Sequence, residues 1–171
     1  MIKPHNIKPY RVISAVLSVL CMILIFCFSC ENGDESSNTS GGFTEFAVEH
    51  FVNGFDDFSP EKQAEIMAET DHIIRKTAHF SIYLALGFLV SCAAGKRRFL
   101  SAGSGMSLLI CFLYACSDEL HQYFVPERSC RFTDVLIDTS GALTGMLISL
   151  ALMKLVIKEK NEHPKNRNIL I

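Results

Sequence analysis

The sequence predicts an all-α fold, an integral membrane bundle of four transmembrane helices. Of the 171 residues, 49% are hydrophobic, which suits one compact membrane domain better than two soluble ones. Four apolar stretches approach the roughly 20 residues that a helical crossing of a bilayer needs. The predicted spans lie at about residues 12–29, 73–94, 99–117 and 132–157, so that residues 12–157 form the membrane domain.

The charges that flank the spans predict their orientation. The segment from Glu31 to Asp71 holds 11 acidic side chains and a single basic one, Lys62. The basic clusters are Lys3, Lys8 and Arg11; Lys96, Arg97 and Arg98; and Lys154, Lys158, Lys160, Lys165 and Arg167. By the positive-inside rule, both termini, residues 1–11 and 158–171, are expected in the cytoplasm.

The first apolar stretch also has features of a cleaved signal peptide, since a basic start precedes it and a polar stretch follows. We expect it to be retained as a span, because its apolar core is long and no Ala-x-Ala site follows. Phe28 makes Cys30 a poor lipoprotein acceptor. The seven cysteines are irregularly spaced, and a disulfide between Cys30 and Cys130 stays open.

Between the first two spans, the sequence predicts a polar loop and then helices. Residues 31–42 are rich in Gly, Ser and Asn, which favour turns. Residues 43–52 carry apolar side chains at helical spacing, which predicts a short amphipathic helix lying on the membrane surface. Asn53-Gly54 ends this helix, and Ser59-Pro60 is a typical helix start. The helix over about 60–71 then either continues into the second span or stops just short of it.

Ionisable residues lie within about a turn of one end of three spans, and threading the chain through a bilayer brings these ends to one face. Ionisable groups in hydrocarbon cost roughly 2.5–3.5 kcal/mol each, so they indicate a functional site. On the second span, Lys76, His79 and Tyr83 share one helix face. Arg75 is expected to point elsewhere and reach the membrane interface.

The third span ends in Asp118 and Glu119, with Gln122 one turn later. Adjacent residues on a helix face different ways, so we expect one acid to face the bundle and pair with Lys76 or Arg128. The other acid is then expected at the water interface.

On the fourth span, Asp134, Asp138, Gly141 and Gly145 share one face. The spacing Gly141-x-x-x-Gly145 permits the close approach of another helix, and we assign these glycines and Gly87 to helix packing. Asp138 lies a turn deeper than Asp134, and its protonation state is left open.

Several chemistries fit this polar set. Its charges can pair with one another and hold three helices together, or its cations and helix N-termini can bind an anion. Paired carboxylates with a histidine can also run acid–base chemistry or hold a divalent cation. The histidine–acid spacings match no metal or hydrolase motif, so no metal and no cofactor is expected. Nothing in the sequence favours nucleic-acid binding.

Three motifs in the same order resemble the VanZ-like family of small membrane proteins. They are Arg75-Lys76-x-x-His79-Phe80-x-x-Tyr83-x-x-Leu86-Gly87, then Ser117-Asp118-Glu119-x-x-Gln122-x-Phe124-x-Pro126-x-Arg128, then Asp134-Val135-Leu136-Ile137 with Gly141-Ala142. Residues 25–29 leading into 33–37 also resemble the family's first span and loop. The chain departs from the family at Glu127, where a glycine is usual, at Asp138, where an asparagine is usual, and at Glu31, often a glutamine.

The resemblance implies a multi-pass bacterial plasma-membrane protein of the cell envelope. The family's namesake is associated with low-level resistance to teicoplanin, a lipid-tailed glycopeptide antibiotic. The resemblance supplies no reaction, so whether the chain is an enzyme is left uncertain, leaning towards a protein without catalysis.

The expected function is binding of an amphiphilic, anionic envelope molecule at the outer face. Lys76, His79 and Arg128 would contact the anion, and Asp118, Glu119, Gln122 and Asp134 would orient them. Expected partners are membrane lipids, and also a lipid-linked cell-wall precursor or a lipoglycopeptide, with an oligomer left open. The alternative is an integral membrane enzyme acting on a cell-wall lipid or peptide; a transporter is less compatible with four short-looped helices.

Overall fold

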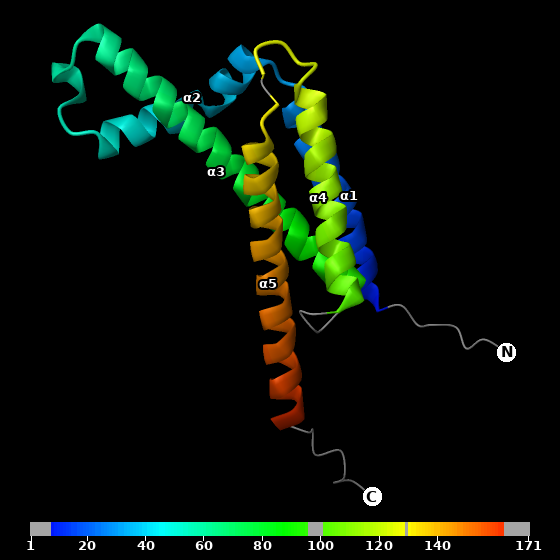
Figure 1. Cartoon of the computed structure of the whole chain (residues 1–171). Coiled ribbons are helices and arrows are strands. Elements are labelled where there is room, and N and C mark those ends of the chain that lie inside the picture. Colours follow the sequence, from blue (N-terminus) through cyan, green and yellow to red (C-terminus); the bar gives the residue numbers. More distant parts are fainter. Residues whose placement is uncertain (1–7, 96–100, 129, 163–171) are drawn as a thin grey trace, which may run out of the picture.

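The computed structural model describes residues 8–95, 101–128 and 130–162, and every regular element within them is helical (Figure 1). The elements are α1 (Pro9–Ser29), α2 (Gly33–Phe51), the 3₁₀ turn η1 (Phe55–Asp57), α3 (Pro60–Ala94), α4 (Ala102–Gln122) and α5 (Phe132–Glu162). The predicted all-α class is therefore confirmed.

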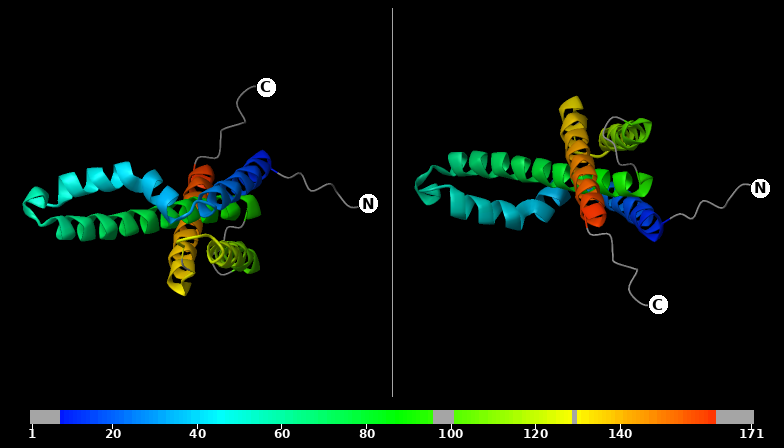
Figure 2. Two further views of the ribbon diagram at one scale, coloured as in Figure 1. Left: turned by 90° about the horizontal axis from the view of Figure 1, so that it is seen from above. Right: turned by 90° about the horizontal axis from the view of Figure 1, so that it is seen from below.

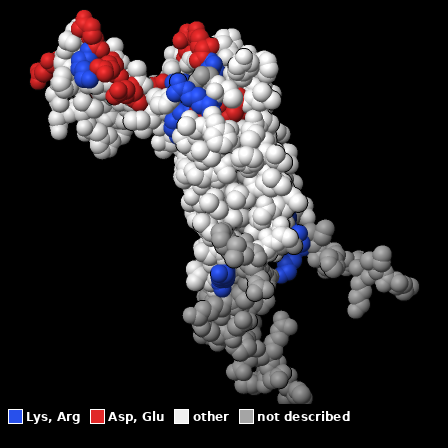
Figure 3. Space-filling view, viewed as in Figure 1, with Lys and Arg blue, Asp and Glu red and all other residues white. Residues whose placement is uncertain are grey.

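Three helices are long and apolar enough to cross a membrane, namely α1, α3 and the Phe132–Leu155 part of α5. Figure 3 shows the corresponding surface, a band of uncharged side chains with charged side chains above and below it. These three apolar helices identify the chain as a membrane protein, and they correspond to three of the four predicted spans.

The third predicted span, residues 99–117, corresponds to α4, which is not among the candidate spans. This helix has 21 residues, but its buried face is polar, with Ser104 and Ser107 near one end and Asp118 and Glu119 near the other. It also ends at Gln122, five residues beyond the predicted boundary, so both acids lie within the helix. The predicted start at Phe99 lies outside the described residues.

The prediction of a polar loop over residues 31–42 is wrong, because α2 begins at Gly33. Asn32 caps the helix: its side chain accepts from the Glu35 amide at 2.8 Å, and the Glu35 carboxylate accepts from the Asn32 amide at 3.1 Å. The predicted short helix over 43–52 is the second half of this longer one. Gly54, with φ of 69°, then turns the chain back towards α3.

The serine-rich face of α2 packs on the first half of α3, and the two helices lie antiparallel, side by side, in an arm that projects from the bundle (Figure 2). Asp71 of α3 is the common acceptor for this face. The hydroxyls of Ser37 and Thr44 donate to it at 3.1 and 3.3 Å, and the Ser40 hydroxyl donates to it as well. These bonds explain why a stretch of turn-forming residues is helical, since tertiary contacts override weak local propensity.

Ser59 caps the start of α3, since its side chain accepts from the Lys62 amide, and the helix continues without a break from the arm into the membrane segment. The sequence left open whether this helix stops before the second span, and the structure shows that it does not. Gly95, with φ of 61°, ends it.

Helices α3 and α5 cross in close contact at glycines. A Cβ atom at Gly145 would overlap the Leu84 carbonyl oxygen, and one at Gly87 would overlap that of Ala142. A Cβ at Gly141 would likewise overlap the Phe80 carbonyl oxygen. The backbones therefore meet directly, as small residues allow between helices in membranes.

Helix α1 packs on α3, and α4 packs on both α3 and α5. The Tyr114 hydroxyl donates to the Met22 carbonyl at 2.6 Å, which joins α4 to α1. Arg11 donates to the last carbonyls of α3, at 2.9 Å to Ala93 and 3.2 Å to Ala94, where a cation also suits the helix dipole. Cys30 and Cys130 are free thiols.

Candidate functional site

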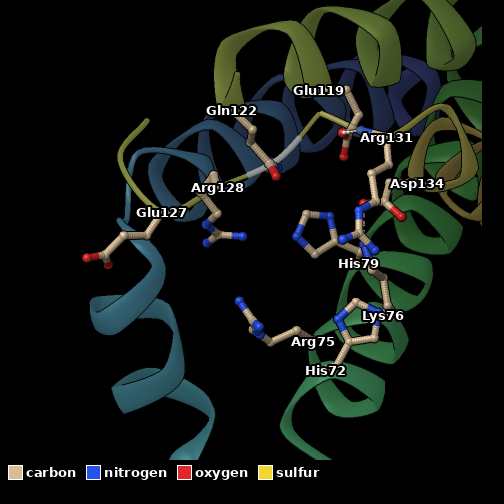
Figure 4. Close-up of a pocket in the computed structure, with 10 residues that line it drawn as sticks. All are labelled: His72, Arg75, Lys76, His79, Glu119, Gln122, Glu127, Arg128, Arg131 and Asp134. Carbon is tan, nitrogen blue, oxygen red and sulfur yellow. Dashed lines mark hydrogen bonds and ion pairs between the residues drawn. The ribbon is translucent and has the colours of Figure 1, made fainter. Parts of the chain in front are cut away.

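A polar cavity of about 190 Å³ lies at the end of the bundle opposite Arg11, where α3, the end of α4, the turn after it and the start of α5 meet (Figure 4). Its lining residues are His72, Arg75, Lys76, His79, Glu119, Gln122, Glu127, Arg128, Arg131 and Asp134. Four of these ten are lysine or arginine and three are aspartate or glutamate, so the cavity is strongly charged with a small excess of positive groups.

Two of the cations are held by acids. Lys76 on α3 forms an ion pair with Asp134 in the first turn of α5, where the helix N-terminus also favours a carboxylate. Arg75 forms an ion pair with Asp71 at 3.1 Å, one turn earlier on its own helix. Asp71 thereby links the arm to the rim of the cavity.

Arg128 has no ion pair among the described residues. Its Nε donates to the Glu31 carbonyl at 3.2 Å, which leaves the other guanidinium nitrogens available to a ligand. Figure 4 shows Arg75 and Arg128 extending into the same space from opposite sides. Burial, and next the charge of Arg75, lower the pKa of the Arg128 guanidinium from its usual value. Two guanidinium groups that repel each other across a cavity create a site suited to an anion.

The end of α4 ties this cavity to α5. The Glu119 carboxylate accepts from the Arg131 amide at 3.1 Å, just before α5 begins. Gln122 donates to Asp118 at 3.4 Å, one turn back on its own helix. Glu119 and Gln122 therefore fix the wall of the cavity.

A second group of polar residues lies beside the cavity and deeper in the bundle. We call His79, Asp118 and Asp138 the His–Asp–Asp cluster; each offers a ligand atom, and these atoms lie within 4.8 Å of one another. His79 Nδ1 is 3.7 Å from the Asp138 carboxylate. The three residues come from α3, α4 and α5, and this donor set can hold a divalent metal ion.

An apolar groove adjoins the cavity between α1, α2 and α3, with a volume of about 190 Å³. Its lining residues are Ile25, Phe28, Glu31, Ser36, Thr39, Ser40, Phe43, Ile74, Arg75, Ala78, His79, Ile82 and Arg128. Arg75, His79 and Arg128 line the polar cavity as well, so these three residues form the border between a charged space and an apolar one.

A comparison with protein families agrees with the three sequence motifs on α3, on the end of α4 with the turn after it, and on α5. A model of the VanZ/LLP1 family matches residues 14–154. The chain belongs to the VanZ/LLP1 family. The match takes in every residue of the polar cavity, the apolar groove and the His–Asp–Asp cluster. Comparisons with curated proteins and with solved structures gave no match.

In this VanZ/LLP1 protein, the residues predicted for the site fall into three places. Lys76, His79, Glu119, Gln122, Arg128 and Asp134 line the polar cavity. Asp118, Asp138 and Tyr83 are buried, with 4%, 1% and 0% of their surface exposed. Gly87, Gly141 and Gly145 lie at the crossing of α3 and α5 and do not line the cavity.

Three details of the prediction are wrong. Arg75 does not point away from the cluster but lines both the cavity and the groove. Asp118 and Glu119 are both buried, so neither lies at a water interface. The partner of Lys76 is Asp134 of α5 rather than an acid of α4.

The sequence reasoning missed His72, Glu127 and Arg131 as lining residues. His72 lies four residues before Lys76, so extending the helical stripe by one turn would have found it. Arg131 enters the cavity through the turn between α4 and α5, which no periodicity describes. The sequence named His79, Asp118 and Asp138 as polar residues of the site but did not group them, because they come from three helices.

Glu127 shapes the turn that carries Arg128. Its φ of 62° lies in the left-handed region, which glycine adopts most readily. The turn rests on the start of α2, where the Gly33 amide donates to the Pro126 carbonyl at 3.4 Å. A Cβ at Gly33 would lie 2.8 Å from the Glu127 Cβ, so this contact needs a glycine on the α2 side.

Proposed function

We propose that this VanZ/LLP1 protein binds an anionic membrane amphiphile, with the head group in the polar cavity and an acyl chain in the apolar groove. The observation that carries the proposal is the shared border. Because Arg75, His79 and Arg128 line both spaces, a single molecule can place its charge against the arginines and its chain beside α1 and α2.

The proposed setting is the outer face of a bacterial plasma membrane, crossed four times with both termini in the cytoplasm. Three spans are supplied by α1, α3 and α5, and α4 is proposed as the fourth, with its polar face turned into the bundle. The basic residues at the start of α1, followed by an acidic segment after its end, favour this orientation by the positive-inside rule. The polar cavity, at the opposite end from Arg11, would then open outward.

The chemistry of the cavity favours a phosphate or carboxylate head group. Arginine binds both anions through two parallel N–H···O bonds, and such charge-assisted bonds contribute about 1.5–3 kcal/mol each. Pockets for drug-sized molecules measure roughly 300–1,000 Å³. At about 190 Å³, the cavity suits a head group rather than a whole glycopeptide. A membrane lipid or a lipid-linked cell-wall precursor therefore fits better than an entire antibiotic.

The first test measures binding of a fluorescent anionic lipid to the purified protein in detergent. Arg128→Gln should weaken binding by about 10–150-fold, which corresponds to the loss of one charge-assisted bond. Lys62→Gln is the matched control, since it removes one positive charge from an exposed ion pair with Glu65 on the arm. Equal affinities for wild type, Arg128→Gln and Lys62→Gln would refute the head-group site.

The groove is tested separately through Ala78, which lines it but not the polar cavity. Ala78→Trp should fill the groove and weaken binding of a long-chain lipid while sparing a short-chain analogue with the same head group. Parallel loss for both ligands would indicate that the substitution disturbs the bundle rather than the groove.

A resistance role would follow if the bound amphiphile alters the access of a lipid-tailed glycopeptide to its membrane target. The measurement is teicoplanin susceptibility of a sensitive Gram-positive host that expresses wild type or Arg128→Ala at matched membrane levels. Protection by wild type and its loss in the variant is the expected result. No protection by well-expressed wild type would separate the binding function from resistance.

The His–Asp–Asp cluster favours one second candidate, an integral membrane enzyme that acts on a cell-wall lipid or peptide. His79 lines the cavity and lies near two carboxylates, so it can move a proton at a bound substrate. Product formation by purified protein with a bell-shaped pH profile, lost in His79→Ala, is the expected result for this candidate. Absence of turnover across candidate lipids would count against it.

A further inference from the structure

We infer that His79, Asp118 and Asp138 bind one divalent transition-metal ion, of the zinc or manganese class, between α3, α4 and α5. This inference goes beyond the proposed amphiphile site and does not depend on it. The ligand atoms are one imidazole nitrogen and two carboxylate oxygens. Imidazole suits zinc and other transition metals and carboxylates suit manganese, whereas calcium and magnesium prefer oxygen ligands alone.

The ligand atoms must move closer together to hold an ion. They lie within 4.8 Å of one another. Bonds from zinc to nitrogen and oxygen are about 2.0–2.2 Å, so two ligand atoms of a tetrahedral ion lie about 3.3–3.6 Å apart. Binding therefore requires the widest pair to close by up to about 1.5 Å, which side-chain rotation can supply.

Asp138 supplies the independent indication of a ligand. It is only 1% exposed, and neither carboxylate oxygen has a hydrogen-bond partner among the described residues. His79 Nδ1 lies 3.7 Å away, which is beyond hydrogen-bond distance. Buried carboxylates are normally paired, hydrogen-bonded or bound to a metal. Asp138 has no hydrogen bond and only the long ion-pair contact with His79, which is the separation expected where a cation can lie between the two groups.

The charges around the cluster favour a divalent ion over a protein cation. Asp118 is also buried and receives a weak hydrogen bond from Gln122 at 3.4 Å. Lys76, three residues before His79 on α3, is already paired with Asp134. Metal binding requires deprotonated carboxylates and a neutral imidazole, and such a ligand set carries a charge of −2, which one divalent ion neutralises.

The surroundings resemble those of a metal site with an open position. Gln122 orients Asp118, as outer partners of metal ligands commonly do. The Tyr83 hydroxyl is buried without a hydrogen-bond partner among the described residues. His79 also lines the polar cavity, which gives an ion a route of entry and leaves a coordination position for an oxygen ligand from the cavity.

The test measures the metal content of the full-length protein, purified in detergent, stripped with a chelator and reloaded with zinc or manganese. Wild type should retain about one ion per chain, measured by inductively coupled plasma mass spectrometry. Its Tm should be several degrees higher than that of the stripped protein. Asp138→Asn, which keeps the side-chain volume, and His79→Gln should each lower the affinity at least tenfold.

One control addresses adventitious zinc, because Cys30 Sγ and His121 Nε2 lie 3.5 Å apart near the protein surface. His121→Gln should retain the wild-type stoichiometry for manganese and the full Tm shift. If loss of the ion follows His121→Gln and not Asp138→Asn, the inferred site is wrong.

Failure of wild type to retain either metal overturns the inference, as does unchanged affinity in both Asp138→Asn and His79→Gln. Should these variants fail to fold, pulsed paramagnetic resonance of manganese-loaded wild type decides, because a bound imidazole adds a nitrogen coupling to the spectrum. Since no lipid is present in these measurements, a negative result leaves amphiphile binding to its own test.

Discussion

Replacing Gly145 with alanine should loosen the crossing of α3 and α5 and lower the stability of the whole bundle. The new Cβ would overlap the Leu84 carbonyl oxygen and lie 2.8 Å from both the Leu84 carbonyl carbon and the Phe88 nitrogen. These are backbone atoms, so no side chain can rotate out of the way. Ordinary contacts of a Cβ atom begin at 3.4 Å, so the helices must separate by at least the difference of 0.6 Å.

The expected magnitude follows from two opposing effects. Overpacking of this kind costs about 1–3 kcal/mol. Alanine in place of glycine elsewhere in a helix stabilises by up to about 1 kcal/mol. Gly105 of α4 isolates the second effect, because a Cβ there meets nothing within 4 Å. Both variants gain the second effect, so they should differ by the overpacking cost of about 1–3 kcal/mol, which corresponds to roughly 2–12 °C in Tm for a chain of this size.

The assay is thermal unfolding of purified Gly145→Ala and Gly105→Ala in the same detergent, followed by circular dichroism. We expect Gly145→Ala below wild type and Gly105→Ala at or slightly above it. A Gly145→Ala variant as stable as Gly105→Ala would refute direct backbone contact between α3 and α5. A loss of the same size in both variants would assign the effect to glycine content rather than to the crossing.

Two further predictions concern the polar end of the bundle. Lys76→Met should destabilise the protein by about 1–3 kcal/mol, because it leaves the Asp134 carboxylate unpaired. In a double-mutant cycle, the double variant Lys76→Met with Asp134→Leu should recover at least half of that loss. Additive losses would show that the ion pair contributes nothing to stability. Glu127→Gly should raise the Tm, because glycine adopts without strain a left-handed conformation that costs other residues roughly 1–2 kcal/mol. An unchanged or lower Tm would show that the contact of Glu127 with Gly33 outweighs this strain.

The membrane-spanning parts of α3 and α5 were predictable from the sequence because a long apolar run and a glycine stripe are both local signals. The glycines of α5 recur on one helix face, and that face meets α3. The start of α3 was equally local, since Ser59 and Pro60 carry the capping signal in two adjacent residues.

Helix α2 was not predictable in its first half, because what holds it lies far along the chain. Ser40 and Thr44 are poor helix formers by propensity, yet both donate to Asp71, which is 27 or more residues away in sequence. A rule based on local composition assigns such residues to turns. Only the pairing of α2 with α3 reverses that assignment.

The polar site was predictable only where its residues follow the spacing of a single helix, which is a local signal. Lys76 and His79 follow helical spacing on α3, and their common face is visible in the sequence. Arg131 reaches the cavity through a turn, and the proximity of Asp118 to Asp138 depends on how α4 and α5 pack. Spacing along one helix contains no information on either, so the His–Asp–Asp cluster and the apolar groove emerge only in three dimensions.

The unbroken course of α3 has a mechanical consequence. Its arm segment between Pro60 and Asp71 rises about 18 Å at 1.5 Å per residue, with no glycine or proline inside it to act as a hinge. A tilt of the membrane segment by about 10° therefore moves the tip of the arm by roughly 3 Å. The cavity residues from His72 to His79 lie on α3 directly after the arm segment. Small rotations of the helix there produce larger displacements at the tip of the arm, and a force applied to the tip acts as a torque on these residues.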